Sequence, residues 1–415
     1  MKLSIIICVY NTPIEYLSEC LRSITESTLG GGVGVSRTDY EILMIDDGSS
    51  IDYSALVSEY GVRYRKTENR GIFLARLLGI ELAEGEYIAF ADSDDTVTVN
   101  YHLPMLRRAE ETGADIIIND WAFRTDRSRY YCKDDTTVSL DLSLVGDECL
   151  SAFTGQRGRM HSFYVLWNKL FRAEVLKKVR ERVESLASGE ERFNYSEDAL
   201  MTFFAFLFAK RVENLHTGYY FYRIHDSQSV TVASEGKLKR QIECMGITLS
   251  VMKENVKGLP LEEKLCEDID EWRRLMSRTH YSHARGARYA SLYPLILKTY
   301  GVARLEKSTR EDGSAYASTV LLGSNVEEID RSLLAIFRGG GTVLSEGLGA
   351  YAKRAVSSMR DVGGRVELSD ETGARIPMEH ISFKRRVYHN PLVYRIGMTL
   401  FPKGSRLRAF LKRRL

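Results

Sequence analysis

The first 120 residues alternate between short β-rich runs and longer helix-like stretches, and this alternation constrains the possible fold more than any other feature of the sequence. Unbroken apolar runs are typical of strands buried on both faces. The expected helices begin after Thr12 and lie near 51–59, at 72–83 and near 102–113. Together these elements predict an α/β fold with a mostly parallel sheet that is covered by helices on both faces. The expected strands are LSIIICV (3–9), YEILMID (40–46), VRYRK (62–66), YIAFA (87–91) and ADIIIND (114–120).

Polar residues follow the expected strands at the point where each strand ends. In sheets of this kind, ligands bind beyond the carboxyl ends of the strands. We therefore expect these side chains to line one crevice, which would be the functional site. They are Tyr10 and Asn11 after the first strand, Asp46 and Asp47 after the second, Asn69 after the third, and Asp92, Asp94 and Asp95 after the fourth.

The pattern changes further along the chain, and it suggests four parts. The alternation weakens after residue 121 but continues the first domain, which we place at 1–230. Residues 231–310 have a helical pattern, and 311–380 have the pattern of a small α/β unit. The remaining part, 381–415, is basic: ten Lys and Arg and no Asp or Glu lie between Lys384 and Leu415.

The composition is that of a soluble globular protein, with 44% hydrophobic and 27% charged residues. The six cysteines lack Cys-x-x-Cys spacing, which disfavours a zinc site and fits a reducing compartment. The N-terminal apolar run of about seven residues is at the lower limit for a signal peptide, and no small-residue cleavage site follows it. The apolar helix candidate at 199–209 is too short to span a bilayer. We therefore expect a cytoplasmic protein.

Four short motifs occur in order along the first domain: VYN (9–11), DDGS (46–49), NRG…AR (69–76) and DSDD (92–95). A single Asp-x-Asp pair arises by chance in most long chains, but each of these motifs lies at a strand end or on the helix that follows. Together they resemble the family-two glycosyltransferases of the GT-A fold, bacterial enzymes that build polysaccharides, capsules and teichoic-acid decorations. The resemblance is firm to about residue 120, looser to about 230, and does not reach further.

The acidic cluster after the fourth strand has two interpretations. It can be a solvated turn that caps the next helix, or it can hold a cation, because Asp92 and Asp94 offer the hard oxygen ligands that Mg²⁺ and Mn²⁺ prefer. The resemblance favours the cation. It implies Mn²⁺ or Mg²⁺ at the diphosphate of a nucleotide sugar, with Asp94 as a direct ligand and Asp92 near the metal and the ribose. Ser93 is then expected among the donor contacts, and Asp95 in a supporting or capping role.

The resemblance also implies how the nucleotide base is recognised. Asp47 should accept a hydrogen bond from the uracil ring NH, and Tyr10, Asn11 and Asn69 belong to the same donor site. The DDGS segment also has the composition of an Asx-type turn in which Gly48 takes a positive φ. The two interpretations are compatible, because such a turn would aim the carboxylate.

Arg76 is informative without the resemblance, because it is the only charged residue between 71 and 80 on an otherwise apolar helix. A guanidinium that is removed from water needs an anionic partner. The candidates are Asp46 or Asp47, in an ordinary salt bridge, and the donor diphosphate. The family commonly has Ala-Arg-Asn here, whereas this chain has Leu77 in place of that Asn, so any role of the Asn is missing.

A second carboxylate pair, Glu197 and Asp198, opens the apolar segment EDALMTFFAF. Ser196 can N-cap this helix, which places both acids in the first turn, where the helix dipole favours ionised carboxylates. Acidic residues are ordinary at this position. The resemblance implies more, because inverting members have a Glu-Asp pair here whose aspartate is the catalytic base. The dipole lowers the pKa while a base works best nearer neutrality, and burial against Phe203 or Phe204 would offset this effect.

Two later segments are also similar to recurrent family elements. YRIHDSQS implies that Arg223 contacts a phosphate and that His225 is a third metal ligand, although a lone histidine is more often structural. WNKLF implies that Trp167 and Lys169 border the acceptor. The alternative for WNKLF is a packed Trp beside a Lys whose ammonium reaches solvent.

The basic tail alternates cations with large apolar residues such as Phe401 and Phe410. It is either a solvated end or an interfacial helix drawn to anionic lipid, which would place the protein at the inner face of the membrane. No fold signature of nucleic-acid binding accompanies it, so we expect no nucleic-acid partner.

The sequence therefore predicts an inverting, metal-dependent glycosyltransferase with a nucleotide-diphosphate donor, UDP being favoured. The acceptor would be a hydroxyl group of a cell-surface glycan or of a lipid-linked molecule. The alternative is a catalytically inactive scaffold that binds nucleotide sugars. A dinucleotide-dependent oxidoreductase is disfavoured, because no Gly-x-Gly-x-x-Gly follows the first strand.

Overall fold

The computed structural model describes residues 1–29, 39–119, 122–126, 129–132, 142–155, 163–187, 193–223, 234–287, 289–300, 302–309 and 315–321. The expectations for His225, for most of the C-terminal α/β unit and for the basic tail fall outside these residues. Met1–Val302 belong to one compact unit, and Ala303–Val320 belong to a second. Strand β13 (Val302–Thr309) pairs with β14 (Ala315–Leu321), and all but one residue of each strand belong to the second unit.

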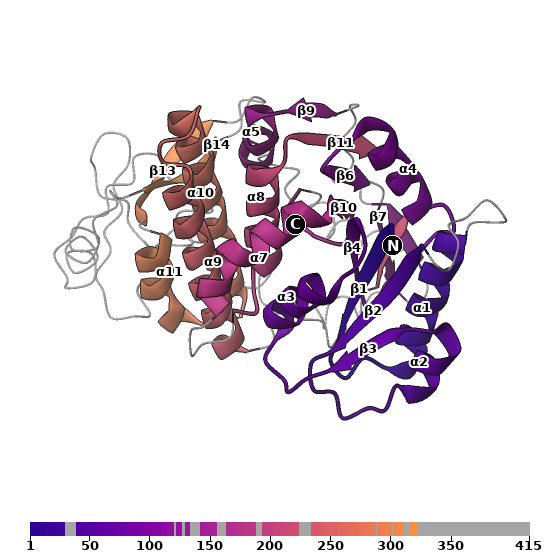
Figure 1. Cartoon of the computed structure of the whole chain (residues 1–415). Helices are drawn as coiled ribbons and strands as arrows, with labels where there is room; N and C mark the ends of the chain where they lie inside the picture. The colour runs from indigo at the N-terminus through magenta and orange to yellow at the C-terminus, as the bar shows by residue number, and fades with distance from the viewer. Residues whose placement is uncertain are drawn as a thin grey trace, which may run out of the picture. The chain divides into compact units, whose positions relative to one another are not determined.

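The first unit is built on a sheet with the strand order β3-β2-β1-β4-β10-β6-β11-β9 (Figure 1). Strands β3, β2, β1 and β4 are parallel, as are β6 and β11, whereas β10 runs antiparallel between β4 and β6 and β9 is antiparallel at the edge. The mostly parallel sheet is thus confirmed. Its strands are β1 (Leu3–Val9), β2 (Tyr40–Asp46), β3 (Arg63–Lys66), β4 (Tyr87–Asp92), β6 (Ile116–Asn119), β9 (Ser143–Val145), β10 (Lys169–Arg172) and β11 (Arg211–Leu215).

Helices lie on both sides of this sheet (Figure 1). One group comprises α1 (Ile14–Leu29), α2 (Ser54–Tyr60) and α4 (His102–Thr112), and the other comprises α3 (Ile72–Leu82), α7 (Ala173–Ala187) and α8 (Glu197–Phe208). The strands between them are buried, and every residue of β2 is inaccessible or nearly so. Strand β3 is exposed throughout because it forms the open edge, which explains its polar sequence.

A second, small sheet lies beside the carboxyl end of β4. Its order is β5-β12-β7-β8, formed by β5 (Thr96–Val97), β12 (Tyr220–Arg223), β7 (Ala122–Asp126) and β8 (Arg129–Cys132). Strand β12 pairs antiparallel with β5, which follows the acidic cluster directly. Through this pairing the chain comes back to the acidic cluster about 130 residues further along, and Arg223 at the end of β12 lies beside the cluster.

The later helices pack on the same compact unit as the sheet. They are α9 (Glu235–Asn255), α10 (Glu262–Gly286) and α11 (Tyr293–Tyr300), with a short 3₁₀ turn, η3 (Ala290–Leu292), before α11. Helix α9 contacts α8, and α10 contacts α5 (Asp147–Gly155). The buried face of α9 includes Leu238, Ile242, Leu249 and Met252.

The expected strands at 3–9 and 40–46 are confirmed, and α3 and α4 have nearly the predicted bounds. The strand predicted at 114–120 is shorter, since β6 begins at Ile116. Asp115 stays outside it because its carboxylate accepts hydrogen bonds from Arg172 Nε at 3.0 Å and from the backbone N–H of Lys210 at 2.7 Å.

Candidate active site

The parallel register brings the polar strand ends to one edge of the sheet. Cys8 in β1 is paired with Asp92 in β4, and Val9 is paired with Asp46 in β2. Tyr10 follows β1 directly and is 56% exposed at this edge. The predicted crevice therefore receives residues from three neighbouring strands.

Two of the predicted donor contacts direct their side chains at neighbouring loops. Asn11 has a φ of 53°, and its backbone N–H donates to Ser49 Oγ at 2.9 Å. Its side-chain Oδ1 accepts the backbone N–H of Ser50 at 2.8 Å. Ser93 is buried and shares a hydrogen bond of 2.6 Å with the hydroxyl of Thr12. These bonds fix the loops after β1, β2 and β4 against one another.

The turn after β2 has the predicted Asx-type geometry. Asp46 is fully buried, and its Oδ1 accepts the backbone N–H of Ser49 at 2.7 Å. Its Oδ2 accepts the hydroxyl of Tyr64 at 2.5 Å. Gly48 has a φ of 82°, as the composition of the turn predicts.

Asp47 closes the loop that leads into α3. Its two oxygens accept the backbone N–H groups of Arg70 at 2.7 Å and of Gly71 at 2.8 Å. Asn69 lies in the same loop, and its backbone nitrogen would be 2.6 Å from a Cβ on Gly48. Each carboxylate oxygen has a further lone pair, so these bonds do not exhaust the acceptor capacity of Asp47.

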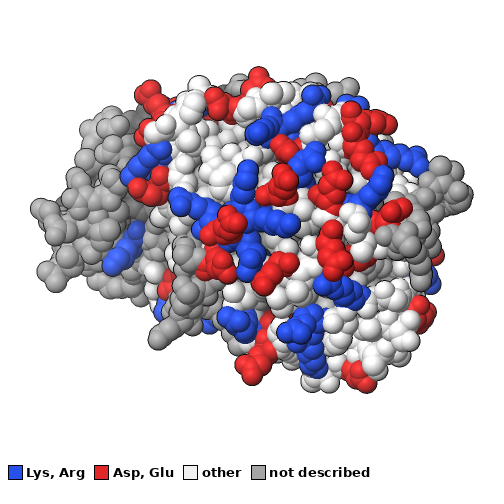
Figure 2. Space-filling view, in the orientation of Figure 1, with Lys and Arg blue, Asp and Glu red and all other residues white. Residues whose placement is uncertain are grey.

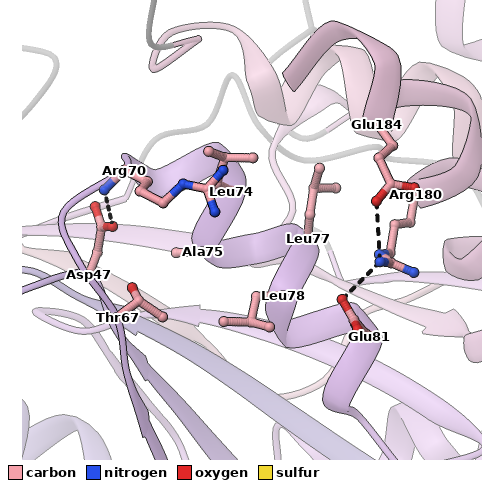
Figure 3. Close-up of a pocket in the computed structure, with 10 residues that line it drawn as sticks. All are labelled: Asp47, Thr67, Arg70, Leu74, Ala75, Leu77, Leu78, Glu81, Arg180 and Glu184. Atoms are coloured by element: carbon pink, nitrogen blue, oxygen red, sulfur yellow. Dashed lines mark hydrogen bonds and ion pairs between the residues drawn. The ribbon is translucent and has the colours of Figure 1, made fainter. Parts of the chain in front are cut away.

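A cavity of about 310 Å³ lies beside Asp47, between α3 and α7 (Figure 3). Leu74, Leu77 and Leu78 form its apolar wall, and Arg180 stands at the far end, paired with two glutamates of α3 and α7. Of the predicted site residues in the described part of the chain, Asp47 alone lines this cavity. The cavity is therefore a separate feature from the acidic cluster.

The acidic cluster is a tight turn in which Ser93 and Asp95 are buried and Asp92 and Asp94 are partly exposed. The backbone N–H of Asp95 donates to the carbonyl of Asp92 at 3.1 Å. Asp95 is 2% exposed, and its burial beside Asp94 and Asp92 raises its pKa well above the usual value. One Asp95 oxygen accepts the backbone N–H of Arg223 at 2.7 Å, which is the supporting role expected for this residue.

Arg223 ties this turn to α1. Its Nε donates to the carbonyl of Asp94 at 2.7 Å, and a terminal nitrogen pairs with Glu19 at 2.5 Å. The guanidinium also lies over the ring of Tyr16, 4.3 Å from its centroid. Arg223 thus lies at the acidic turn, while its predicted contact with a phosphate stays a prediction.

Tyr220 supports the turn from β12, although no sequence pattern marks it. Its hydroxyl accepts the backbone N–H of Asp92 at 3.1 Å, and its ring stacks on Trp167 with centroids 4.2 Å apart. Burial raises the pKa of Tyr220 well above the usual value. Trp167 is 6% exposed, so the structure favours the packing role for this residue.

Lys169 is fully buried, and the expectation that its ammonium reaches solvent is wrong. Its Nζ donates to the carbonyl of Val165 at 2.5 Å and to Asn168 Oδ1 at 2.7 Å. These local oxygens replace water around the charge, which is why a lysine can occupy the interior here.

Arg76 pairs with acids that were not among its predicted partners. Its Nη1 donates to Glu197 Oε1 at 2.6 Å, and its Nη2 lies 3.4 Å from Asp92 Oδ1. The candidate salt bridge to Asp46 or Asp47 is not formed, because those carboxylates are held by their own turns, and the contact with the donor diphosphate stays a prediction. The site thereby joins α3, β4 and α8.

Ser196 occupies the N-cap position of α8, as predicted, but its side chain does not make the capping hydrogen bond. Ser196 has a left-handed conformation, with φ 61° and ψ 13°, and its side chain makes no cap hydrogen bond to the first turn of α8. The next residue, Glu197, is 7% exposed and points to Arg76. Asp198 is half-buried, and its Oδ1 accepts the backbone N–H of Ala199 at 2.7 Å.

The electrostatics of this cluster are set by burial and by its own charges. Burial and Glu197 raise the pKa of Asp198 to about 7, and they outweigh the opposing effects of Arg76 and of the hydrogen bond from the backbone N–H of Ala199. Burial also raises the pKa of Asp92 to about 6, with Asp94 acting in the same direction and Arg76 opposing. Arg76 has a raised pKa, because its acidic neighbours outweigh the effect of its burial. The cluster can therefore exchange protons near neutral pH.

Within the described ranges, no group of three or more His, Cys, Asp or Glu side chains is arranged to hold a metal ion. In the same part of the chain, every helix is too short or too polar to cross a membrane. On the face drawn in Figure 2, Lys and Arg lie among Asp and Glu, and the described residues there form a mixed surface and not a patch of one sign.

Comparisons with known proteins find similar sequences and a similar fold. Residues 4–180 match the family model described as glycosyl transferase family 2. The chain is 27% identical over 298 residues to the putative glycosyltransferase EpsH of Bacillus subtilis, which covers 68% of this chain and 80% of that protein. It is 25% identical to the poly(ribitol-phosphate) beta-glucosyltransferase of Bacillus spizizenii, over 67% of this chain but only 44% of that protein.

A solved structure is similar in fold. The crystal structure of S. aureus TarS 1–349 in complex with UDP-GlcNAc matches with a TM-score of 0.53 at 17% sequence identity, covering 87% of this chain and 90% of that chain. Together with the sheet and the acidic turn at its carboxyl edge, this likeness defines the GT-A class and confirms the expected fold. Residues 4–180 are therefore similar to glycosyl transferase family 2, and the relatives that match the chain are named as glycosyltransferases.

Proposed function

We propose that the chain is a glycosyltransferase, which moves a sugar from a nucleotide-diphosphate donor, in particular a UDP-sugar, to a hydroxyl group with inversion at the anomeric carbon. The observation that carries the proposal is the charged cluster at the sheet edge, where Arg76 joins Asp92 to Glu197 in the first turn of the helix that contains Asp198. The donor class is supported by the relatives, since one is named as a glucosyltransferase and the TarS structure contains UDP-GlcNAc.

A divalent cation fits the donor set of the acidic turn. The Asp92 side chain is 32% exposed, and Asp94 is also partly exposed, so both offer carboxylate oxygens to a ligand. Mg²⁺ is usually held by one or two carboxylates, with water and substrate phosphates at its other positions. We assign Asp92 and Asp94 to holding Mn²⁺ or Mg²⁺, and His225 is a further candidate. The bound ion would neutralise charge that develops on the leaving diphosphate.

Asp198 is the proposed catalytic base. Its ionised carboxylate accepts the proton of the acceptor hydroxyl while that oxygen attacks the anomeric carbon. The bond between this carbon and the diphosphate oxygen breaks, and the nucleoside diphosphate leaves with the electron pair. A pKa of about 7 keeps Asp198 partly ionised at neutral pH and basic enough to take the proton, an effect typically worth about 10²–10⁴-fold.

The remaining donor contacts follow from the same edge. Asp47 would recognise the base through the lone pairs that its two hydrogen bonds leave over. Tyr10 lies at the same edge of the sheet, and Asn69 lies in the loop that Asp47 closes. Arg76 directs two of its five N–H donors at carboxylates, which leaves donors for the diphosphate. Glu197 would keep Arg76 in place and keep the pKa of Asp198 high.

We further propose that the acceptor is a cell-surface glycan or a lipid-linked molecule. The name of the Bacillus spizizenii relative, which refers to poly(ribitol-phosphate), supports this class. A lipid-linked acceptor would suit an enzyme at the cytoplasmic face of the membrane, held there by the basic residues 384–415.

A donor screen tests the proposal. The full chain is incubated with UDP-, GDP- and CMP-sugars, with and without Mn²⁺, and the release of free nucleotide is measured. We expect release of UDP from a UDP-sugar in the presence of Mn²⁺ and its loss on chelation with EDTA. Binding of UDP without any turnover would instead identify an inactive scaffold, and turnover that resists EDTA would contradict the metal assignment.

A further inference from the structure

The turn before the two carboxylates of α8 has an unusual backbone. Ser196 has a φ of 61°, in the left-handed region that L side chains rarely adopt. Glycine and asparagine are common in this conformation, whereas serine needs a compensating contact. Because Glu197 and Asp198 follow immediately, the backbone conformation of Ser196 determines the direction in which their side chains leave the main chain.

The compensating contact comes from α9. The hydroxyls of Ser196 and Thr248 lie 2.8 Å apart, and both residues are buried, Thr248 completely. Ser196 Oγ also donates to the carbonyl of Tyr195 at 2.5 Å. A serine hydroxyl has a single proton, so Ser196 accepts the hydrogen bond and Thr248 donates it.

Helix α9 is itself a firm support. Gly246 lies so close to α11 that an added Cβ would come within 2.2 Å of Thr299 Cγ2. Helix α9 also packs against α10 and α8. Thr248 therefore presents its hydroxyl from a helix that is fixed on several sides.

The other side of the turn rests on α3. A Cβ on Gly71 would lie 2.0 Å from Asn194 Oδ1, and the N–H of Gly71 is held by Asp47. The segment from Asn194 to Ser196 is thus enclosed between Gly71, the N-cap residue of α3, and the buried face of α9.

We propose that Thr248 is a positioning residue, which holds Ser196 in its left-handed conformation and thereby orients Glu197 and Asp198. Thr248 lies outside the segment that matches the family model, which ends at residue 180. The role rests on the proposed function, in which Asp198 is the base. The helices after the sheet domain are then part of the catalytic machinery and not only an appendage.

Isosteric substitution provides the test. Thr248→Val removes the hydroxyl and keeps the shape, and Thr248→Ser restores the hydroxyl. Thr202→Val is the matched control, because Thr202 is equally buried on α8 and its hydroxyl donates to the carbonyl of Tyr164 at 3.0 Å, away from the turn. UDP release from UDP-GlcNAc and UDP-glucose is measured, with kcat and the donor KM determined separately.

We expect Thr248→Val to lower kcat by about tenfold or more while the donor KM stays within about twofold, since a small misplacement of a reacting group is costly. Thr248→Ser should recover kcat to within about threefold, and Thr202→Val should leave it unchanged. A Thr248→Val enzyme with the wild-type kcat, or a loss equal to that of Thr202→Val, would overturn the proposal.

Hydrogen exchange provides a second measurement that needs no turnover. Amides at 196–199 should exchange about tenfold faster in Thr248→Val than in Thr202→Val. If the wild-type chain releases no nucleotide, the proposed function fails, and the exchange data alone decide whether Thr248 holds the turn. If turnover requires Asp198 but neither kcat nor exchange responds to Thr248→Val, only the positioning role fails.

Discussion

The guanidinium of Arg76 connects two carboxylates from distant parts of the chain: it donates to Glu197 at 2.6 Å and lies 3.4 Å from Asp92. Asp92 belongs to the proposed metal site, and Glu197 precedes the proposed base. A single buried cation thus links the group that would hold the donor to the helix that would carry out proton transfer.

The pair of Arg76 and Glu197 should matter for stability. Arg76→Met leaves a buried carboxylate without its cation, which typically costs about 3–5 kcal/mol. Arg180→Met is the matched control, because Arg180 pairs with Glu81 and Glu184 near the surface, where such pairs contribute about 0–1 kcal/mol. Urea denaturation should separate the two variants clearly, and equal losses would show that the Arg76 pair is not a buried one in solution.

The pH dependence of turnover should report the raised pKa of Asp198. A base with a pKa of about 7 is protonated below that pH, so kcat/KM at saturating Mn²⁺ should fall about tenfold per pH unit on the acid side of 7. Glu197→Gln removes one cause of the raised pKa and should move this acid limb to lower pH. An acid limb that lies near pH 4 in the wild type, or that does not move in Glu197→Gln, would be inconsistent with this assignment.

Metal affinity should depend on the protonation of Asp92. Its pKa is raised to about 6, so protons compete with the cation below that pH, and Mn²⁺ affinity should weaken as the pH falls from 7 to 5. Calorimetric titration with Mn²⁺ and UDP measures this change. Asp94→Asn should abolish the binding, whereas Asp52→Asn, which alters an exposed carboxylate outside the site, should retain it.

Gly71 offers a test of the packing around the site. Gly71→Ala introduces a Cβ at a φ of 99° and against Asn194, so it combines backbone strain with a steric clash. The expected loss is about 1–3 kcal/mol or more. Gly113→Ala is a matched control, because Gly113 also has a positive φ, of 68°, but no atom lies within 4 Å of the added Cβ. If Gly113→Ala were the more destabilising variant in thermal unfolding, the close approach of Gly71 to Asn194 would be wrong.

The elements that position the donor site could be predicted because their signals are local. The apolar run of β1 and the DDGS turn with Gly48 each depend on a few adjacent residues. The partner of Arg76 could not be predicted in this way. Glu197 is 121 positions further along the chain, and only the tertiary fold, in which α7 packs against both α3 and α8, brings it there.

For residue types that are common at protein surfaces, the sequence does not indicate burial or distant contacts. Lys169 has no sequence feature that distinguishes a buried lysine from an exposed one, and the carbonyl that receives its ammonium is formed by the local fold. Thr248 and Tyr220 likewise act through single hydroxyls supplied by distant elements. Such contacts depend on tertiary packing and leave no periodic pattern.

The most direct test of the account is Asp198→Asn, an isosteric change that removes the proposed base. UDP binding by calorimetry and sugar transfer or donor hydrolysis are measured side by side on the wild type and the variant. The account predicts that UDP and Mn²⁺ bind with affinity within about twofold of the wild type, whereas turnover falls by about 10²-fold or more. Turnover at the wild-type rate in Asp198→Asn would contradict the central claim.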